Sequence, residues 1–182
     1  MSSTSIYTIG HSNTDLAAFL KLLRAHDIQQ IADVRSYPTS RRLPHFSRDI
    51  LEQSLATANT RYRWFKALGG LRKPKPNSPH IGWQVAGFRS YADHMETPEF
   101  DGALSELLDW AEDALTSLLC SERLWWQCHR RLLSDKLVTR GRRVLHILSD
   151  KSPEPHHLTD FLRLDGDHLI YDRTLFTPNE KA

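Results

Sequence analysis

Short apolar runs rich in β-branched residues alternate along this chain with segments of helical periodicity, and this alternation limits the folds that it can adopt. Four runs predict buried strands: "SIYTIGHS", "QQIADVRSYP", "LTSLLC" and "RRVLHILS". Between the first two, "TDLAAFLKLLRAHDI" places its large apolar residues on one helical stripe. Strand, helix and strand in this order form a βαβ unit with parallel strands and a right-handed crossover. We therefore expect an α/β fold: an open, mostly parallel, Rossmann-like sheet with helices on both faces.

The rest of the chain predicts further helices and one more strand. A helix is expected in "SRDILEQSLATANT", a strand in "RYRWFKALGG", and two helices broken at Pro98 in "SYADHMETPEF" and "DGALSELLDWAEDAL". A last helix is expected over residues 122–141, ended by Gly141. Residues from about 70 to 88 hold three prolines and predict a long basic loop, and the tail from about residue 150 is less regular around an Asp-Gly turn. The length of 182 residues fits one domain spanning 1–182.

Composition and charge place the chain among ordinary globular proteins. There are 24 Lys and Arg against 22 Asp and Glu, so the net charge does not indicate a protein that wraps nucleic acid. The N-terminus has no charged start followed by an apolar run, and no stretch approaches the roughly 20 apolar residues of a membrane-spanning helix. Two cysteines in such a chain suit a reducing compartment. We expect a cytoplasmic protein with no membrane partner.

Reactive and anion-binding side chains follow three of the predicted strands. His11 and Ser12 follow the first strand, Asp33 and Arg35 end the second with Ser40 and Arg41 beyond, and Cys120 and Glu122 end the third, followed by Cys128, His129 and Arg130. Open α/β sheets bind ligands outside the carboxyl ends of their strands. The sequence therefore predicts a functional pocket at this edge, and the basic loop at 70–88 predicts a flap over it.

These residue types suit covalent or acid/base chemistry on an anionic substrate. The catalytic candidates are Glu122, Asp33, His11, Cys120 and His129. The binding candidates are Ser12, Arg35, Ser40, Arg41, Lys73, Cys128 and Arg130. Guanidinium groups match two phosphate oxygens at once, which is why we expect the arginines to hold phosphate. Glu122 suits a general base or the carboxylate that faces an oxocarbenium-like carbon, whereas Cys120 needs a lowered pKa to act as a nucleophile.

The same residues also have structural interpretations. Asp33 and Arg35 are two positions apart on a strand, so they share a face and can pair with each other. Cys120 can serve as a small buried hydrophobe, and Trp125 and Trp126 as core residues.

Several familiar motifs are absent from the sequence. Neither GxGxxG nor GxxxxGK[ST] occurs, so a conventional dinucleotide fingerprint and a P-loop are not expected. The position six residues after Cys120 is Trp126, which argues against the Cys-x5-Arg cradle of cysteine phosphatases. The spacing Cys-x7-Cys-His differs from that of ordinary zinc motifs. We expect no metal and no cofactor.

Seven segments in order resemble a known family along nearly the whole chain. They are "YTIGHS", "ADVRSYPTSRR", "FS…L…YRWFKALGG", "FRSYADHMETPEF", "LLCSE", "CHRRLLSDKL" and "VLHIL". The chain is similar to domain of unknown function 488, a family of small bacterial and archaeal proteins. The resemblance implies an α/β fold and no particular activity, because none is assigned to the family. Its marker segments coincide with the strand ends described above.

Three functional hypotheses remain open on the sequence. The first is an enzyme that hydrolyses or transfers a group of a phosphate-bearing substrate, a nucleotide or nucleic acid, at the strand-end pocket. The second is a non-catalytic nucleic-acid-binding module that uses its basic loops and aromatic side chains. The third is a metal- or redox-sensing protein that uses Cys120, Cys128 and nearby histidines.

Overall fold

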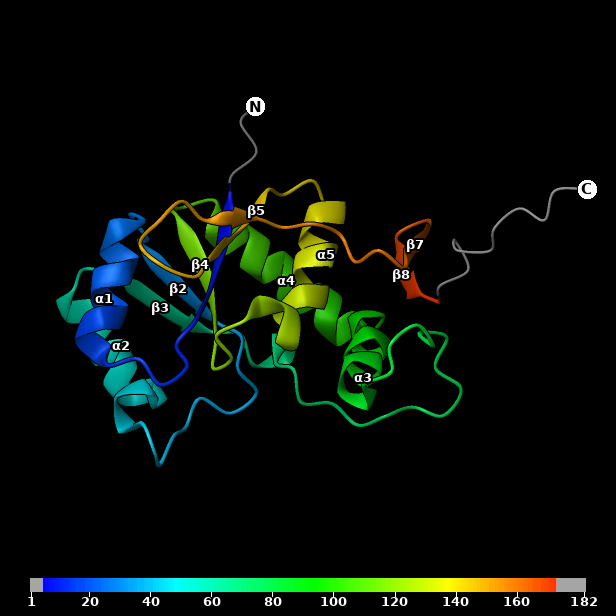
Figure 1. The fold of residues 1–182 in the computed structure, drawn as a ribbon, viewed down its shortest axis with the longest axis horizontal. Coiled ribbons are helices and arrows are strands. Elements are labelled where there is room, and N and C mark those ends of the chain that lie inside the picture. Colours follow the sequence, from blue (N-terminus) through cyan, green and yellow to red (C-terminus); the bar gives the residue numbers. More distant parts are fainter. Residues whose placement is uncertain (1–4, 173–182) are drawn as a thin grey trace, which may run out of the picture.

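A six-stranded sheet lies between two groups of helices in the computed structural model, which describes residues 5–172 (Figure 1). Its strands are β1 (Ile6–Gly10), β2 (Gln30–Asp33), β3 (Arg61–Trp64), β4 (Thr116–Cys120), β5 (Val144–Ile147) and β6 (Glu154–Pro155). Their order is β3-β2-β4-β1-β5-β6; the first five are parallel, and β6 runs antiparallel to β5. The predicted open, mostly parallel α/β sheet is confirmed.

Strand β4 lies between β1 and β2, although the chain reaches it last of the three. Its register pairs Cys120 with Gly10 of β1 and Leu119 with Asp33 of β2. The carboxyl ends of β2, β4 and β1 are therefore immediate neighbours at one edge of the sheet. The predicted βαβ unit has parallel strands, but its two strands are separated by one strand position.

Helices cover both faces of the sheet, as predicted. On one face lie α1 (Leu16–Ala25) and α2 (Arg48–Thr57), and on the other α4 (Pro98–Ala111) and α5 (Arg130–Thr139) (Figure 1). The helix α3 (Ala86–Met95) packs against α4 and α5. The first group packs Phe19, Leu23, Leu51 and Leu55 against the sheet, and the second packs Leu104, Leu107, Leu132 and Leu133. Burial of these apolar stripes is the main stabilising contribution to the layered arrangement. Among the described residues, no helix is both long and apolar enough to span a bilayer.

The helix predicted over residues 122–141 is wrong in its first half. Only α5 is α-helical; Trp125–Gln127 form a short 3-10 helix, η3, and Cys128 is extended with φ −136° and ψ 169°. The guanidinium of Arg130 donates to the backbone carbonyls of Glu122 and Arg123. Those carbonyls would accept helical N–H groups if the helix began earlier. Side-chain bonding by Arg130 therefore replaces the expected first turns.

Long irregular segments connect the remaining elements. Residues 69–85 form the predicted loop, which ends three residues earlier than expected because α3 begins at Ala86. Its start follows the short helix η2 (Lys66–Leu68), and another, η1 (Pro44–Phe46), precedes α2. In the tail, β7 (Leu162–Asp165) and β8 (His168–Tyr171) pair as a separate hairpin. Gly166 turns this hairpin with φ +59°, which confirms the Asp-Gly turn.

The two borders of the six-stranded sheet differ from its interior strands. At one border, β3 exposes Arg61 and Arg63, which pair with Asp113 and Glu106. At the other, β6 is only two residues long and contains Pro155, which has no backbone N–H to donate.

Candidate functional site

A pocket of about 460 Å³ opens at the carboxyl ends of β1, β2 and β4. Six of the residues predicted from the sequence line it: His11, Arg35, Ser40, Cys120, Glu122 and His129. The loop at 69–85 contributes Gly70 and Leu71, and the first turn of α3 contributes Gly87 and Phe88. The chain thus brings together at one cavity side chains from three strand ends that are far apart in the sequence.

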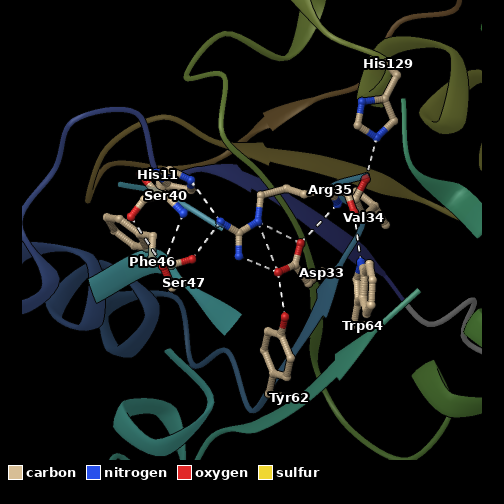
Figure 2. Close-up of polar contacts among 10 residues, drawn as sticks. All are labelled: His11, Asp33, Val34, Arg35, Ser40, Phe46, Ser47, Tyr62, Trp64 and His129. Atoms are coloured by element: carbon tan, nitrogen blue, oxygen red, sulfur yellow. Dashed lines mark hydrogen bonds and ion pairs between the residues drawn. The ribbon is translucent and has the colours of Figure 1, made fainter. Parts of the chain in front are cut away.

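Cys120 and His129 face each other in this pocket. The Cys120 sulfur lies 3.9 Å from Nδ1 of His129, and Nε2 of the same ring lies 2.9 Å from the backbone carbonyl oxygen of Val34 (Figure 2). A carbonyl oxygen only accepts hydrogen bonds, so Nε2 carries a proton and donates it. In the neutral ring, Nδ1 therefore presents its lone pair to the sulfur. This arrangement allows a histidine to take the proton of a thiol.

The second cysteine lies beside the first, and both are free thiols. The Cys128 sulfur, the Cys120 sulfur and a His129 ring nitrogen all lie within 4.8 Å of one another. A hydrogen bond from Cys128, helped by the nearby His129 and Arg130, holds the pKa of the Cys120 thiol well below its usual range, although burial opposes the shift. Burial raises the pKa of Cys128, which keeps its S–H available as a donor. The two shifts thus favour Cys120 as the thiol of the pair that ionises first.

Arg130 supplies the buried positive charge next to the thiols. Its backbone N–H and its Nε donate to the Cys128 sulfur at 3.4 and 3.1 Å. The residue is 1% exposed, and no carboxylate pairs with it among residues 5–172. A buried guanidinium is costly unless a negative group compensates it. When the Cys120 thiol ionises, its negative charge lies beside Cys128, the hydrogen-bond partner of Arg130, and supplies that compensation.

A chain of hydrogen bonds continues from Arg130 away from the pocket. Arg130 Nη1 donates to Thr8 Oγ1 at 3.4 Å, and Thr8 Oγ1 lies 2.7 Å from His146 Nδ1. His146 Nε2 lies 2.9 Å from His156 Nδ1, and His156 Nε2 donates to Asp135 at 3.0 Å. Burial lowers the pKa of His146 to about 2, so this ring is neutral. This chain of hydrogen bonds links Arg130 to the Asp135 carboxylate on its far side.

Arg35 and Asp33 form a buried ion pair at the wall of the pocket (Figure 2). Arg35 Nε and Nη2 donate to the two carboxylate oxygens at 2.9 and 2.5 Å, and Nη1 donates to the Phe46 carbonyl at 2.8 Å and to His11 Nε2 at 3.3 Å. These bonds use four of the five guanidinium N–H groups. The Tyr62 hydroxyl donates to Asp33 at 2.7 Å. The predicted pairing of Asp33 with Arg35 is confirmed.

His11 is held as a neutral acceptor beside Arg35. Its Nδ1 donates to the Ser12 carbonyl at 2.8 Å, which leaves Nε2 unprotonated towards the guanidinium. Its ring stacks on Phe46 with ring centroids 4.0 Å apart. Burial lowers the pKa of His11 to about 4. At neutral pH this side chain therefore positions Arg35 and carries no charge.

Several predicted site residues do not reach the pocket. Asp33 is 0% exposed, pairs with Arg35 and does not line the pocket. Cys128 and Arg130 are buried behind Cys120, and Ser12 lines a separate, smaller cavity. Arg41 and Lys73 are exposed and do not line the pocket. Among the predicted phosphate-binding side chains, only Arg35 and Ser40 line it.

The loop predicted to act as a flap is attached to the body of the protein at both ends of its basic stretch. The Ser36 hydroxyl accepts the Leu71 N–H at 2.7 Å, and Arg72 donates to the Ala67 carbonyl of η2 at 2.5 Å. Further along, Lys75 donates to the Asp93 carbonyl at 3.4 Å. Arg72 and Lys75 thus donate to backbone oxygens, and neither residue lines the pocket.

Some of the residues that line the pocket, and the buried network behind it, were not predicted from the sequence. The missed lining residues are Ser36, Tyr37, Thr39, Gly70, Leu71, Gly87, Phe88 and Ser121. A signal for one of them was available in "LGG", because adjacent glycines mark a close approach of backbone to another group. A Cβ at Gly70 would lie 2.5 Å from His129 Nδ1. For the network, the signal was the histidine inside the apolar run "VLHIL".

Comparison with known proteins gives one family. The family model described as "Domain of unknown function DUF488" matches residues 15–137, more than half of the chain. The matched stretch includes Cys120, Cys128, His129 and Arg130, and it begins after His11. No significant match is found among curated proteins or among solved structures.

Proposed function

The chain belongs to the family described as domain of unknown function DUF488, and since that description names no reaction, we propose from the site itself that the protein is an enzyme. Its reaction is hydrolysis or group transfer through a covalent bond to Cys120. One observation carries the proposal: the sulfur of a thiol with a depressed pKa faces Nδ1 of a histidine whose tautomer is fixed, inside a pocket. Nucleophile, base and orienting group are the parts that thiol catalysis requires.

The proposed reaction has two steps. The Cys120 thiolate attacks an electrophilic carbon of the substrate, and the leaving group departs with the proton from Nδ1 of protonated His129. A water molecule or a second substrate then gives a proton to His129, attacks the same carbon and releases the thiolate. The Val34 carbonyl keeps the ring oriented throughout, because it holds Nε2 in both protonation states.

Glu122 is placed to assist the second step. Its side chain is exposed, lines the pocket, and has no hydrogen bond or ion pair to other described residues. Such a carboxylate can accept a proton from an incoming water or acceptor hydroxyl. In this proposal Glu122 and His129 share the acid/base work, and His11 and Asp33 only position Arg35.

The proposed substrate is a phosphate-bearing molecule, a nucleotide or nucleic acid, that reacts at carbon. Attack at phosphorus is disfavoured because no Cys-x5-Arg cradle surrounds Cys120. The phosphate would instead be a recognition group. Supporting this, the positively charged Arg35 side chain lines the pocket, and so does the first turn of α3, where backbone N–H groups attract anions. Both thiols must stay reduced, which fits the expected cytoplasmic location.

Two acetyl donors test the reaction and the substrate class together. Acetyl phosphate and p-nitrophenyl acetate transfer the same acetyl group, but only the first carries a phosphate. We expect an acetyl adduct on Cys120 by intact-protein mass spectrometry from both donors, with saturation at lower concentration for acetyl phosphate. Glu122→Gln should accumulate the adduct because its breakdown slows. Undiminished turnover in Cys120→Ser would refute the covalent route, and equal saturation by both donors would refute the phosphate preference.

The non-catalytic nucleic-acid-binding alternative remains a prediction. It would use Arg41 and Lys73, which are exposed and lie outside the pocket. A non-catalytic binder should lose affinity for nucleic acid steeply as the salt concentration rises. Its Cys120→Ser variant should bind nucleic acid as well as the wild-type protein does. Steep salt dependence without any acetyl adduct on the wild-type protein would favour this alternative.

A further inference from the structure

We infer that the two thiols and the imidazole at the bottom of the pocket also form a binding site for a thiophilic divalent cation such as Zn²⁺, and that the bound cation blocks covalent chemistry at Cys120. The blocking rests on the proposed function, whereas the binding does not. Cys120, Cys128 and His129 are all buried, and each offers one ligand atom to the same small volume.

The distances between the ligand atoms match those of a metal site. In a tetrahedral zinc site, Zn–S and Zn–N bonds of about 2.3 and 2.0–2.1 Å place sulfur and nitrogen ligands roughly 3.5–3.8 Å apart. The Cys120 sulfur and Nδ1 of His129 are 3.9 Å apart, and all three ligand atoms lie within 4.8 Å of one another. Binding therefore requires side-chain adjustments of an ångström or less.

The groups around the ligands are those that support metal binding. A metal-bound histidine generally donates its other ring N–H to a carbonyl or carboxylate, and Nε2 of His129 already donates to the Val34 carbonyl. The Cys128 sulfur accepts two N–H groups of Arg130, which stabilises it as a thiolate when the cation displaces its proton. Two thiolates and a dication are then neutral together, and Arg130 keeps its hydrogen bonds to the backbone carbonyls of Glu122 and Arg123.

The spacing Cys-x7-Cys-His conceals this site in the sequence. Ordinary zinc motifs hold two ligands on one short turn. Here Cys120 ends β4 while Cys128 and His129 immediately precede α5, and the folded segment 121–127 returns the chain to the strand end. Proximity therefore comes from the fold and not from a local knuckle.

Occupancy and catalysis exclude each other because they use the same lone pair. A cation bound to the Cys120 sulfur withdraws the electron pair that attacks carbon and occupies Nδ1, the nitrogen that moves the proton. Three protein ligands leave the fourth tetrahedral position for water or another ligand. Since Cys120 and His129 line the pocket, the blocked atoms are those a substrate must reach.

Cobalt titration of the reduced, chelator-treated, full-length protein tests the binding. Co²⁺ replaces Zn²⁺ in such sites and reports thiolate ligation by a sulfur-to-metal charge-transfer absorption band. We expect one equivalent to bind with this band, and affinity to fall at least 100-fold in Cys128→Ser and in His129→Gln. The matched control is His11→Gln, a histidine that lines the same pocket without belonging to the cluster. No stoichiometric band, unchanged affinity in Cys128→Ser, or equal loss in His11→Gln would overturn the inference.

A second measurement tests the exclusion and separates it from the proposed function. One equivalent of Zn²⁺ should slow iodoacetamide labelling of Cys120 at least tenfold, and EDTA should restore it. Undiminished acetyl turnover in the zinc-saturated protein would overturn the exclusion. Stoichiometric binding with no acetyl adduct in the metal-free protein would refute the proposed function and leave the metal site standing. Acetylation of Cys120 without any metal binding would refute the metal site and leave the proposed function standing.

Discussion

Gly70 lies so close to His129 that a methyl group at position 70 would stand 2.5 Å from the imidazole Nδ1. That nitrogen is the one that faces the Cys120 sulfur. The ring is further held by the Val34 carbonyl and by an edge contact with Tyr91 at 5.0 Å between ring centroids. A side chain at position 70 therefore acts directly on the geometry of the reactive pair.

Gly70→Ala should displace His129 and reduce the reactivity of Cys120. Because the ring is held on its other sides, the added methyl group forces it away from Cys120 or from Val34. We expect the iodoacetamide rate of Cys120 at pH 7 to fall at least tenfold, measured by mass spectrometry.

Gly87→Ala is the matched control: Gly87 also lines the pocket, but a Cβ there meets no atom within 4 Å. That variant should keep its reactivity. Equal effects of the two substitutions would contradict this account.

The alkylation of Cys120 should depend on pH in a way that reports its hydrogen bond from Cys128. Only the thiolate reacts, and the depressed pKa keeps Cys120 ionised below the range of an ordinary thiol. In Cys128→Ala the donor with the largest effect on this pKa is lost, so the midpoint of the rate profile should move to higher pH and the rate at pH 7 should fall. An unmoved midpoint, or one at lower pH, would show that Cys128 does not stabilise the thiolate.

Arg130→Met should destabilise the protein far more than the same change ten residues later. Removing Arg130 leaves the carbonyls of Glu122 and Arg123 without their donor and the thiolate without its counter-charge. We expect a loss of about 3–5 kcal/mol in the free energy of unfolding, measured with urea. Arg140, just after α5, only approaches Asp101 at 3.7 Å on the surface. Arg140→Met should cost less than about 1 kcal/mol. Similar losses in both variants would remove the case for a buried charge cluster.

Acid should destabilise the fold through histidines that stay neutral when buried. The pKa of His11 is lowered to about 4 and that of His146 to about 2, whereas an unfolded histidine binds its proton below roughly 6.5. Between these values the unfolded state holds more protons, so stability falls as the pH falls. At pH 5 each histidine should cost about 2 kcal/mol relative to pH 8. His11→Gln should lose less stability on acidification than wild type; an identical decline in urea midpoint would contradict the assignment.

Asp33→Asn and Tyr62→Phe should distinguish the contribution of the Asp33–Arg35 ion pair to stability from that of the Tyr62 hydrogen bond. The first leaves the guanidinium of Arg35, which is 6% exposed, without a carboxylate and should cost about 3–5 kcal/mol. The second removes one hydroxyl donor from Asp33 and should cost about 1 kcal/mol. Urea unfolding of both variants provides the measurement. A larger loss in Tyr62→Phe would mean that the hydroxyl, and not the charge, holds this wall of the pocket.

The layers of the fold were predictable from local patterns, but the order of the strands was not. The apolar run at Ile6–Gly10 and the stripe of Leu16–Ala25 each indicate their own element, because burial of one face determines the residue period. Whether β4 inserts between β1 and β2 depends on contacts between segments far apart in sequence. The failed helix start before α5 has the same cause, since the donor that occupies the Glu122 carbonyl belongs to Arg130.

The location of the pocket was predictable because parallel strands end at a common edge. That rule correctly placed His11, Arg35, Cys120 and His129 around one cavity. It could not distinguish side chains that face the cavity from those that face inward. Arg130 points towards Thr8 and Cys128, and its direction follows from packing that no local pattern encodes.

The borders of the sheet bear on how the molecule behaves at high concentration. Exposed, unpaired strand edges recruit other chains into intermolecular β-structure, and charged side chains, prolines and very short edge strands are the features that prevent it. Here guanidinium groups project along β3, while β6 offers two residues and a proline. Neither border of this sheet is therefore a ready template for intermolecular strand pairing.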